Sequence, residues 1–107
     1  MPIQKRWSRF TKKRLQSVSK VRGIYELGDA NREVLYIGKG GSESGVKSRL
    51  GIHKVQKPKS VRLFRAKPAS LFESPIQMEH EECAKFKKKH GRLPRLQKRM
   101  PRDFSFW

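Results

Sequence analysis

The spacing of apolar residues predicts strands in the middle of the chain. Apolar and polar residues alternate at 21–27, a second strand-like run rich in β-branched and aromatic residues follows at 34–37, and the turn-forming residues Gly-Asp-Ala-Asn lie between the two runs. Two strand-like runs on either side of a turn are typical of a β-hairpin. A third run, at 61–66, is rich in apolar and β-branched residues and predicts a strand that pairs with the hairpin.

Two helices are predicted around the third strand. A glycine- and serine-containing loop at 38–42 leads into a short helix with Val46 and Leu50 four residues apart on one face. A second helix is expected from Pro75, because Ser74 can cap it and proline suits the first helical position. The predicted order is therefore β, β, α, β, α, which indicates an α+β fold.

The 107 residues leave room for one domain and one modest core. Residues 21–98 hold the predicted strands and helices and form that domain. Residues 1–20 form a basic N-terminal arm, either an amphipathic helix or a tail that orders on binding. Residues 99–107 form a C-terminal tail with three aromatic residues.

The charge of the chain indicates its class of partner. There are 27 Lys and Arg against 9 Asp and Glu, a formal net charge of +18. Such a chain repels itself unless a polyanion offsets the charge, so nucleic acid is the expected partner. DNA is favoured over RNA, but the sequence leaves the choice between them open. A membrane is disfavoured because no apolar run approaches the roughly 18 residues of a membrane span.

The N-terminal sequence and the single cysteine indicate a reducing compartment. The start lacks the apolar stretch of a secretory signal, and Cys83 has no second cysteine with which to form a disulfide or a zinc site. We therefore expect a protein of the cytoplasm, nucleoid or nucleus that is not secreted. Its oligomeric state is left open.

Two tripeptides on the predicted hairpin carry a specific resemblance. Gly-Ile-Tyr at 23–25 and Tyr-Ile-Gly at 36–38 leave ten residues between their tyrosines, and Arg49, His53 and Glu79 follow. Over residues 21–98 this arrangement resembles the GIY-YIG nucleases. The resemblance implies a three-stranded antiparallel sheet flanked by helices. It also implies a metal-dependent endonuclease that hydrolyses phosphodiester bonds.

Phosphodiester hydrolysis needs an activated water and groups that stabilise the charge gained at phosphorus. Tyr25 and Tyr36 lie on paired strands, so both hydroxyls can reach one cleft and assist the water, and which of them is the base stays open. A tyrosine base requires nearby positive charge to lower its pKa, and Lys39 is the candidate source. The planar guanidinium of Arg49 can grip two phosphate oxygens.

One carboxylate, Glu79, is the expected ligand for Mg²⁺ or Mn²⁺, because such ions retain several waters and also bind substrate phosphate. Glu82, one helical turn on, is the fallback ligand. His53, one turn beyond Arg49, can orient water or hydrogen-bond a tyrosine. Gln97 stands where the resembled family usually has asparagine, and it is the candidate supporting amide.

Five basic residues are predicted to contact the nucleic acid: Lys39, Arg49, Lys54, Arg95 and Lys98. Backbone contacts of this type make binding salt-dependent and mostly independent of sequence. The alternative to the nuclease is a catalytically inactive basic protein that binds nucleic acid, associated with structured RNA or a ribonucleoprotein. The change to glutamine at residue 97 and the extreme charge support this alternative.

Overall fold

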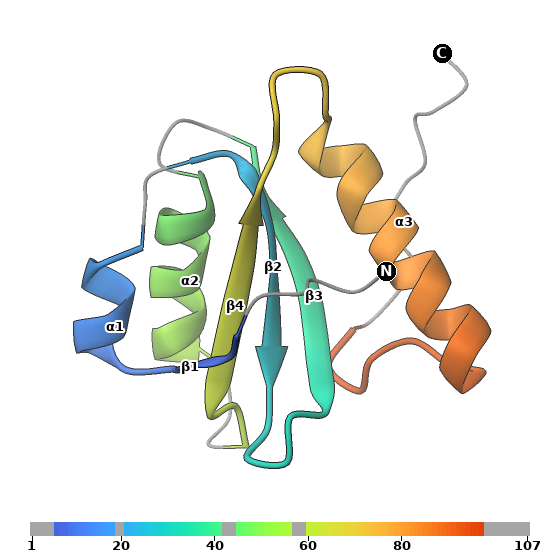
Figure 1. Cartoon of the computed structure of the whole chain (residues 1–107). Helices are drawn as coiled ribbons and strands as arrows, with labels where there is room; N and C mark the ends of the chain where they lie inside the picture. The colour runs from blue at the N-terminus through green and yellow to red at the C-terminus, as the bar shows by residue number, and fades with distance from the viewer. Residues whose placement is uncertain (1–5, 19–20, 42–44, 57–59, 98–107) are drawn as a thin grey trace.

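The structure is a computed structural model that describes residues 6–18, 21–41, 45–56 and 60–97. Within these ranges the strands form one antiparallel sheet, which Figure 1 shows with helices on both sides. The sheet order is β1-β4-β2-β3. The strands are β1 (Ser8–Arg9), β2 (Gly23–Gly28), β3 (Val34–Gly40) and β4 (Leu63–Pro68).

The α+β prediction is confirmed, and the predicted hairpin is β2 and β3. The sheet has four strands rather than the three predicted, because Ser8 and Arg9 pair with β4 at its outer edge. A backbone hydrogen bond from Phe10 N–H to the Arg62 carbonyl, at 2.8 Å, continues the contact. Two residues are too few to show an alternating pattern, so no periodicity predicted this strand.

The helices cover opposite faces of the sheet. They are α1 (Lys12–Gln16), α2 (Gly45–Gln56) and α3 (Pro75–His90). Neighbouring residues of a strand point to opposite faces, and on β2 Tyr25 packs with Leu50 of α2 whereas Ile24 packs with Met78 of α3. Figure 1 accordingly shows α1 and α2 on one side and α3 on the other.

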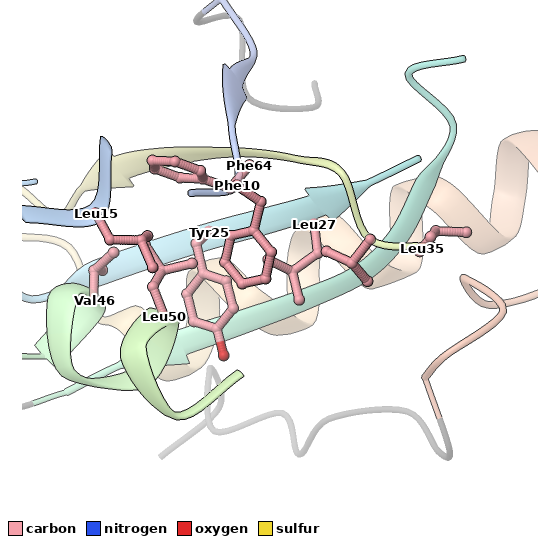
Figure 2. Close-up of a cluster of buried hydrophobic side chains, with 9 residues drawn as sticks. Phe10, Leu15, Tyr25, Leu27, Leu35, Val46, Leu50 and Phe64 are labelled. Atoms are coloured by element: carbon pink, nitrogen blue, oxygen red, sulfur yellow. The ribbon is translucent and has the colours of Figure 1, made fainter. Parts of the chain in front are cut away.

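The larger core lies between the sheet and the pair α1 and α2 (Figure 2). Phe10 and Leu15, from the segment predicted as a basic arm, belong to it. Over the described residues this segment therefore packs as part of the domain, and its helix, α1, is confined to Lys12–Gln16. Its basic residues face outward, and Lys12, Lys13 and Arg14 are exposed.

The start and end of α3 agree with the sequence prediction. The Ser74 hydroxyl accepts a hydrogen bond from the Gln77 N–H at 3.4 Å, and Pro75 occupies the first turn. Gly91 ends the helix with a φ of 75°, a conformation that favours glycine. In the described part of the chain, no helix has both the length and the apolar character needed to cross a bilayer.

Candidate active site

The predicted catalytic residues gather at the β3 edge of the sheet. β3 is the last strand of the sheet, and both α2 and α3 contact it from opposite faces. Side chains from the two faces can therefore meet around this edge without passing through the sheet. Four elements, β2, β3, α2 and α3, contribute to the cluster described below.

Two tyrosines form the centre of the cluster. Tyr25 on β2 and Tyr36 on β3 have ring centroids 6.2 Å apart and an interplanar angle of 32°. Tyr25 has no exposed surface and Tyr36 is half-buried. Figure 2 shows the Tyr25 ring inside the core and its hydroxyl pointing away from the other labelled side chains. The ring is thus a core residue and the hydroxyl belongs to the site.

Gly38 makes room for the tyrosine pair. It lies directly opposite Tyr25 in the β2–β3 register. A Cβ at this position would overlap the ring and hydroxyl of Tyr25 and would lie 2.8 Å from the Tyr36 ring. Sequence reasoning treated this glycine as part of a signature and missed its function. The signal was a glycine within a strand, which often marks close approach by another group.

Arg49 joins the two phenols from α2. Its side chain is exposed, and its guanidinium lies close enough to the hydroxyls of Tyr25 and Tyr36 to lower the pKa of each through its charge and hydrogen bonding. Arginine has donors only, so the phenol oxygens accept. The tyrosines therefore orient the guanidinium, which keeps a solvent-facing side on which a phosphate can bind.

Glu79 reaches the same edge from α3. Its residue is 8% exposed, and its Oε1 lies 3.5 Å from Lys39 Nζ. Burial raises the pKa of the Glu79 carboxyl, and the positive charges of Lys39 and Arg49 oppose that rise. The charge of Glu79 in turn contributes to raising the pKa of both tyrosines, so all these groups are within electrostatic reach of one another.

The expected lowering of the tyrosine pKa by Lys39 was wrong. Burial is the largest cause of a raised pKa at both Tyr25 and Tyr36, and Arg49 is the group that opposes it. Lys39 stands three residues after Tyr36 on the same strand, so their side chains point to opposite faces. Its ammonium pairs with Glu79 instead. In the protein alone, both phenols are protonated near neutral pH.

The fallback ligand Glu82 belongs to a different part of the molecule. It lines a cavity of about 510 Å³ on the α3 face, where Glu26 and Arg65 form a buried ion pair with Nε and Oε1 2.6 Å apart. Lys85 Nζ lies 3.9 Å from Glu82 Oε1. Of these two carboxylates, Glu79 is the one within electrostatic reach of Tyr25, Tyr36 and Arg49. Sequence reasoning did not find the Glu26–Arg65 pair.

Several predicted contact residues lie apart from the cluster. Lys54 Nζ sits 5.6 Å from the centroid of the Phe10 ring, on the side of α1. Arg95 Nε lies 3.2 Å from Glu33 Oε2, so its charge is partly satisfied within the protein. The side chain of His53 and all of Lys98 lie outside the described residues.

The side chain of Gln97 forms hydrogen bonds with the backbone of β3. Its Oε1 accepts from the Ile37 N–H and its Nε2 donates to the Ile37 carbonyl, both at 3.0 Å. The side-chain amide therefore replaces the neighbouring strand that an edge strand lacks. Ile37 is adjacent to Tyr36 and Gly38, so Gln97 acts on the site by fixing this strand.

The cluster suits a hard divalent cation that is held mainly by water. Among the described residues, no group of three or more His, Cys, Asp and Glu could form a complete protein cage. Glu79 supplies one buried carboxylate, and Mg²⁺ or Mn²⁺ commonly binds with one or two carboxylates, several waters and substrate phosphate. The donor set therefore fits such an ion only together with a phosphate substrate.

The fold and site define an α+β domain with a mixed-charge cluster at one sheet edge. Residues 1–83 match the family described as a domain of unknown function (DUF7508), and the chain belongs to that family. No curated protein and no solved structure matches the chain.

The expected membership in the GIY-YIG nucleases is wrong. The family matched is the domain of unknown function, and no GIY-YIG family matches. Two tripeptides on neighbouring strands fix the local arrangement of a hairpin, which unrelated sheets can share. Function must therefore be argued from the cluster itself.

Proposed function

We propose that this domain is a metal-dependent phosphodiesterase that hydrolyses nucleic acid, with DNA favoured over RNA. The observation that carries the proposal is the convergence of two phenols, a guanidinium and a buried carboxylate at one sheet edge. These groups come from four separate elements. A packing role alone would not explain a glycine that clears space for the phenols, or an arginine held by both.

The guanidinium of Arg49 would bind the scissile phosphate. Its planar donors match two phosphate oxygens, and charge gained there in the transition state strengthens the contact. The exposed lysines and arginines of a chain with a net charge of +18 would hold the flanking backbone. Lys39, with 40% of its side chain exposed, is one of them and pairs with Glu79.

Glu79 would hold Mg²⁺ or Mn²⁺, which when bound supplies positive charge to the phosphate oxygens. The Lys39 ammonium now opposite the carboxylate would then be free to turn to the phosphate. Because like charges repel, ion binding weakens the Lys39–Glu79 pair. The pair thus keeps the buried carboxylate compensated when no ion is present.

The two tyrosines would serve different purposes. Tyr36 is half-buried, so its hydroxyl is accessible to a water that it can orient by hydrogen bonding. Tyr25 is fully buried, so it acts by positioning Arg49. The water oxygen forms the new bond to phosphorus and releases a proton to solvent. The bond from phosphorus to the leaving oxygen breaks, and that oxygen keeps the electron pair and takes up a proton from solvent.

A protein that binds nucleic acid without cutting it is the second candidate. The Lys39–Glu79 ion pair favours it, because a carboxylate with a cation at 3.5 Å already has a partner. The raised pKa of both phenols favours it too, since neither is prepared to act as a base.

Incubation with supercoiled DNA and with structured RNA, with Mg²⁺, Mn²⁺ or chelator, separates the two candidates. The phosphodiesterase nicks DNA only with metal, and Glu79→Gln and Arg49→Ala each lower the rate by about 100-fold or more. Glu81→Gln is the matched control, since Glu81 is an exposed acid of the same helix. Binding without cleavage under every metal, unaffected by Glu79→Gln, would establish the second candidate.

A further inference from the structure

The connection between β4 and α3, residues 69–74, exposes two large apolar side chains. Leu71 is 86% exposed and Phe72 is 96% exposed. Figure 1 shows this connection projecting beyond the end of the sheet. Isolated exposed apolar residues are ordinary, but here two neighbours stand together at the tip of a turn.

The turn that carries them is held by several hydrogen bonds. The Ser70 N–H donates to the Glu73 carboxylate at 2.9 Å, and the Glu73 N–H donates to the Ser70 carbonyl at 3.1 Å. The guanidinium of Arg22 donates to the Ser70 carbonyl at 3.0 Å and also to the Glu73 carbonyl. The backbone is thus ordered on folding, so binding through the tip carries little further ordering cost.

The tip lies at the end of the sheet that bears the candidate active site. Pro68, the last residue of β4, pairs with Gly23, which pairs on its other side with Gly40 of β3. Phe72 precedes α3 by three residues and Glu79 lies four residues into it. Chain and helix geometry then keep their Cα atoms within about 17 Å, roughly five base-pair steps.

The surroundings of the tip carry positive charge. Lys39, Ile24 and Lys67 lie side by side across β3, β2 and β4, one row below the tip. The Lys67 residue is exposed, as is 40% of the Lys39 side chain. The one acid of the turn, Glu73, is turned toward the Ser70 amide. An occupant with apolar faces and an anionic frame matches these features, and nucleic acid has both.

We propose that Leu71 and Phe72 form a wedge that inserts into duplex DNA where base stacking is already interrupted, while a nearby phosphate binds at the cluster. The proposal rests on the proposed function and names its substrate class. Inserting an apolar side chain requires unstacking of a base step, which is least costly at a nick, gap or bulge. The wedge therefore selects interrupted duplexes over intact ones.

The test uses a duplex of about 20 base pairs, long enough to span tip and cluster, with 2-aminopurine beside a single nick. The same label in an intact duplex is the reference, and chelator prevents cleavage. The whole chain should raise the fluorescence of the nicked duplex and bind it about tenfold more tightly than the intact one. Leu71→Ala with Phe72→Ala should abolish both effects and leave the salt dependence of binding unchanged.

Ile76→Ala is the matched control, because Ile76 is an apolar residue near the tip that is 37% exposed. It should retain the fluorescence rise and the preference. Both tip residues are exposed, so the double variant should keep the melting temperature of the unaltered chain.

Three outcomes would overturn the wedge. Binding without a fluorescence rise, or with a rise that the double variant retains, refutes the wedge. Hydrolysis is then still tested separately by metal-dependent nicking of plasmid DNA. The unaltered chain and Ile76→Ala could instead self-associate or bind anionic phospholipid vesicles, with the double variant losing that property. Such a result would assign the tip to that partner. Absence of binding to either duplex at low salt would refute both this proposal and the proposed function.

Discussion

At the residue scale, the site depends on which face of a strand each side chain occupies. Lys39 and Tyr36 are close in sequence, yet the lysine pairs with Glu79 on the α3 face while the tyrosine packs toward the α2 core. The pairing compensates a carboxylate that burial has otherwise made costly to ionise.

Replacing Lys39 with methionine should raise the pKa of Glu79 further, because the Lys39 ammonium lowers that pKa more than any other group does. The pKa of Glu79 in the folded protein already exceeds its ordinary value. The contribution of Glu79 to the free energy of unfolding is therefore greatest below that ordinary value and falls as the pH rises through the folded-state pKa. NMR titration of the Glu79 carboxyl carbon measures the change. Lys88→Met, which removes an exposed lysine of α3, should leave it unaltered.

Gly38→Ala should destabilise the domain by about 1–3 kcal/mol, the usual cost of overpacking a core position. The added methyl overlaps the Tyr25 ring, which the surrounding core prevents from moving. Gly51→Ala is the opposite control, since nothing lies within 4 Å of its Cβ in α2. It should stabilise by about 0.5–1 kcal/mol. Urea denaturation compares the two, and equal effects would contradict the assigned packing.

At the element scale, β3 is an edge strand that must hold its shape without a neighbour on one side. Gln97 provides a substitute through two hydrogen bonds to Ile37. Both α2 and α3 contact this strand, as they also contact β2. Its position therefore determines whether Arg49 and Glu79 can serve one substrate.

Gln97→Ala should cost about 1–2 kcal/mol, since two hydrogen bonds are lost and the freed groups are partly rehydrated. Hydrogen exchange of the Ile37 amide should accelerate more than that of amides in β4. Arg95→Ala removes an exposed ion pair with Glu33 and should cost less than about 0.5 kcal/mol. An unaltered exchange rate of the Ile37 amide in Gln97→Ala would show that the two hydrogen bonds between Gln97 and Ile37 do not form in solution.

At the scale of the whole molecule, a net charge of +18 on 107 residues opposes compaction. The basic residues of α1, the exposed lysines at the end of α3 and the cations near the cluster lie on different sides of the sheet. A polyanion that passes over the domain would relieve repulsion at several of these places together.

The melting temperature should therefore rise as NaCl increases from about 0.05 to 0.5 M, because screening weakens the repulsion between cations. Short DNA duplexes at low salt should raise it more, through binding to the folded state. Differential scanning fluorimetry measures both, with sucrose as the uncharged control. A melting temperature that is insensitive to salt would mean that the charges are already compensated within the fold.

The sequence by itself determined the hairpin, the third strand, the capped helix α3 and the strongly basic character, because these depend on alternation, turn residues and composition. It also singled out Tyr25, Tyr36, Arg49 and Glu79 as candidate site residues, and in the structure these four lie within electrostatic reach of one another. It did not determine the family, since a short motif describes a local geometry and the comparison with families overturned that inference.

Only the tertiary structure decided which residues meet. Four features depend on which distant segments come into contact and which do not. They are the strand β1, the hydrogen bonds from Gln97 to β3, the Lys39–Glu79 pair and the exposure of Leu71 and Phe72. The same holds for the raised pKa of the phenols, which burial causes. Periodicity reports which face a residue occupies on its own element, whereas burial and pairing depend on what the other elements place against that face.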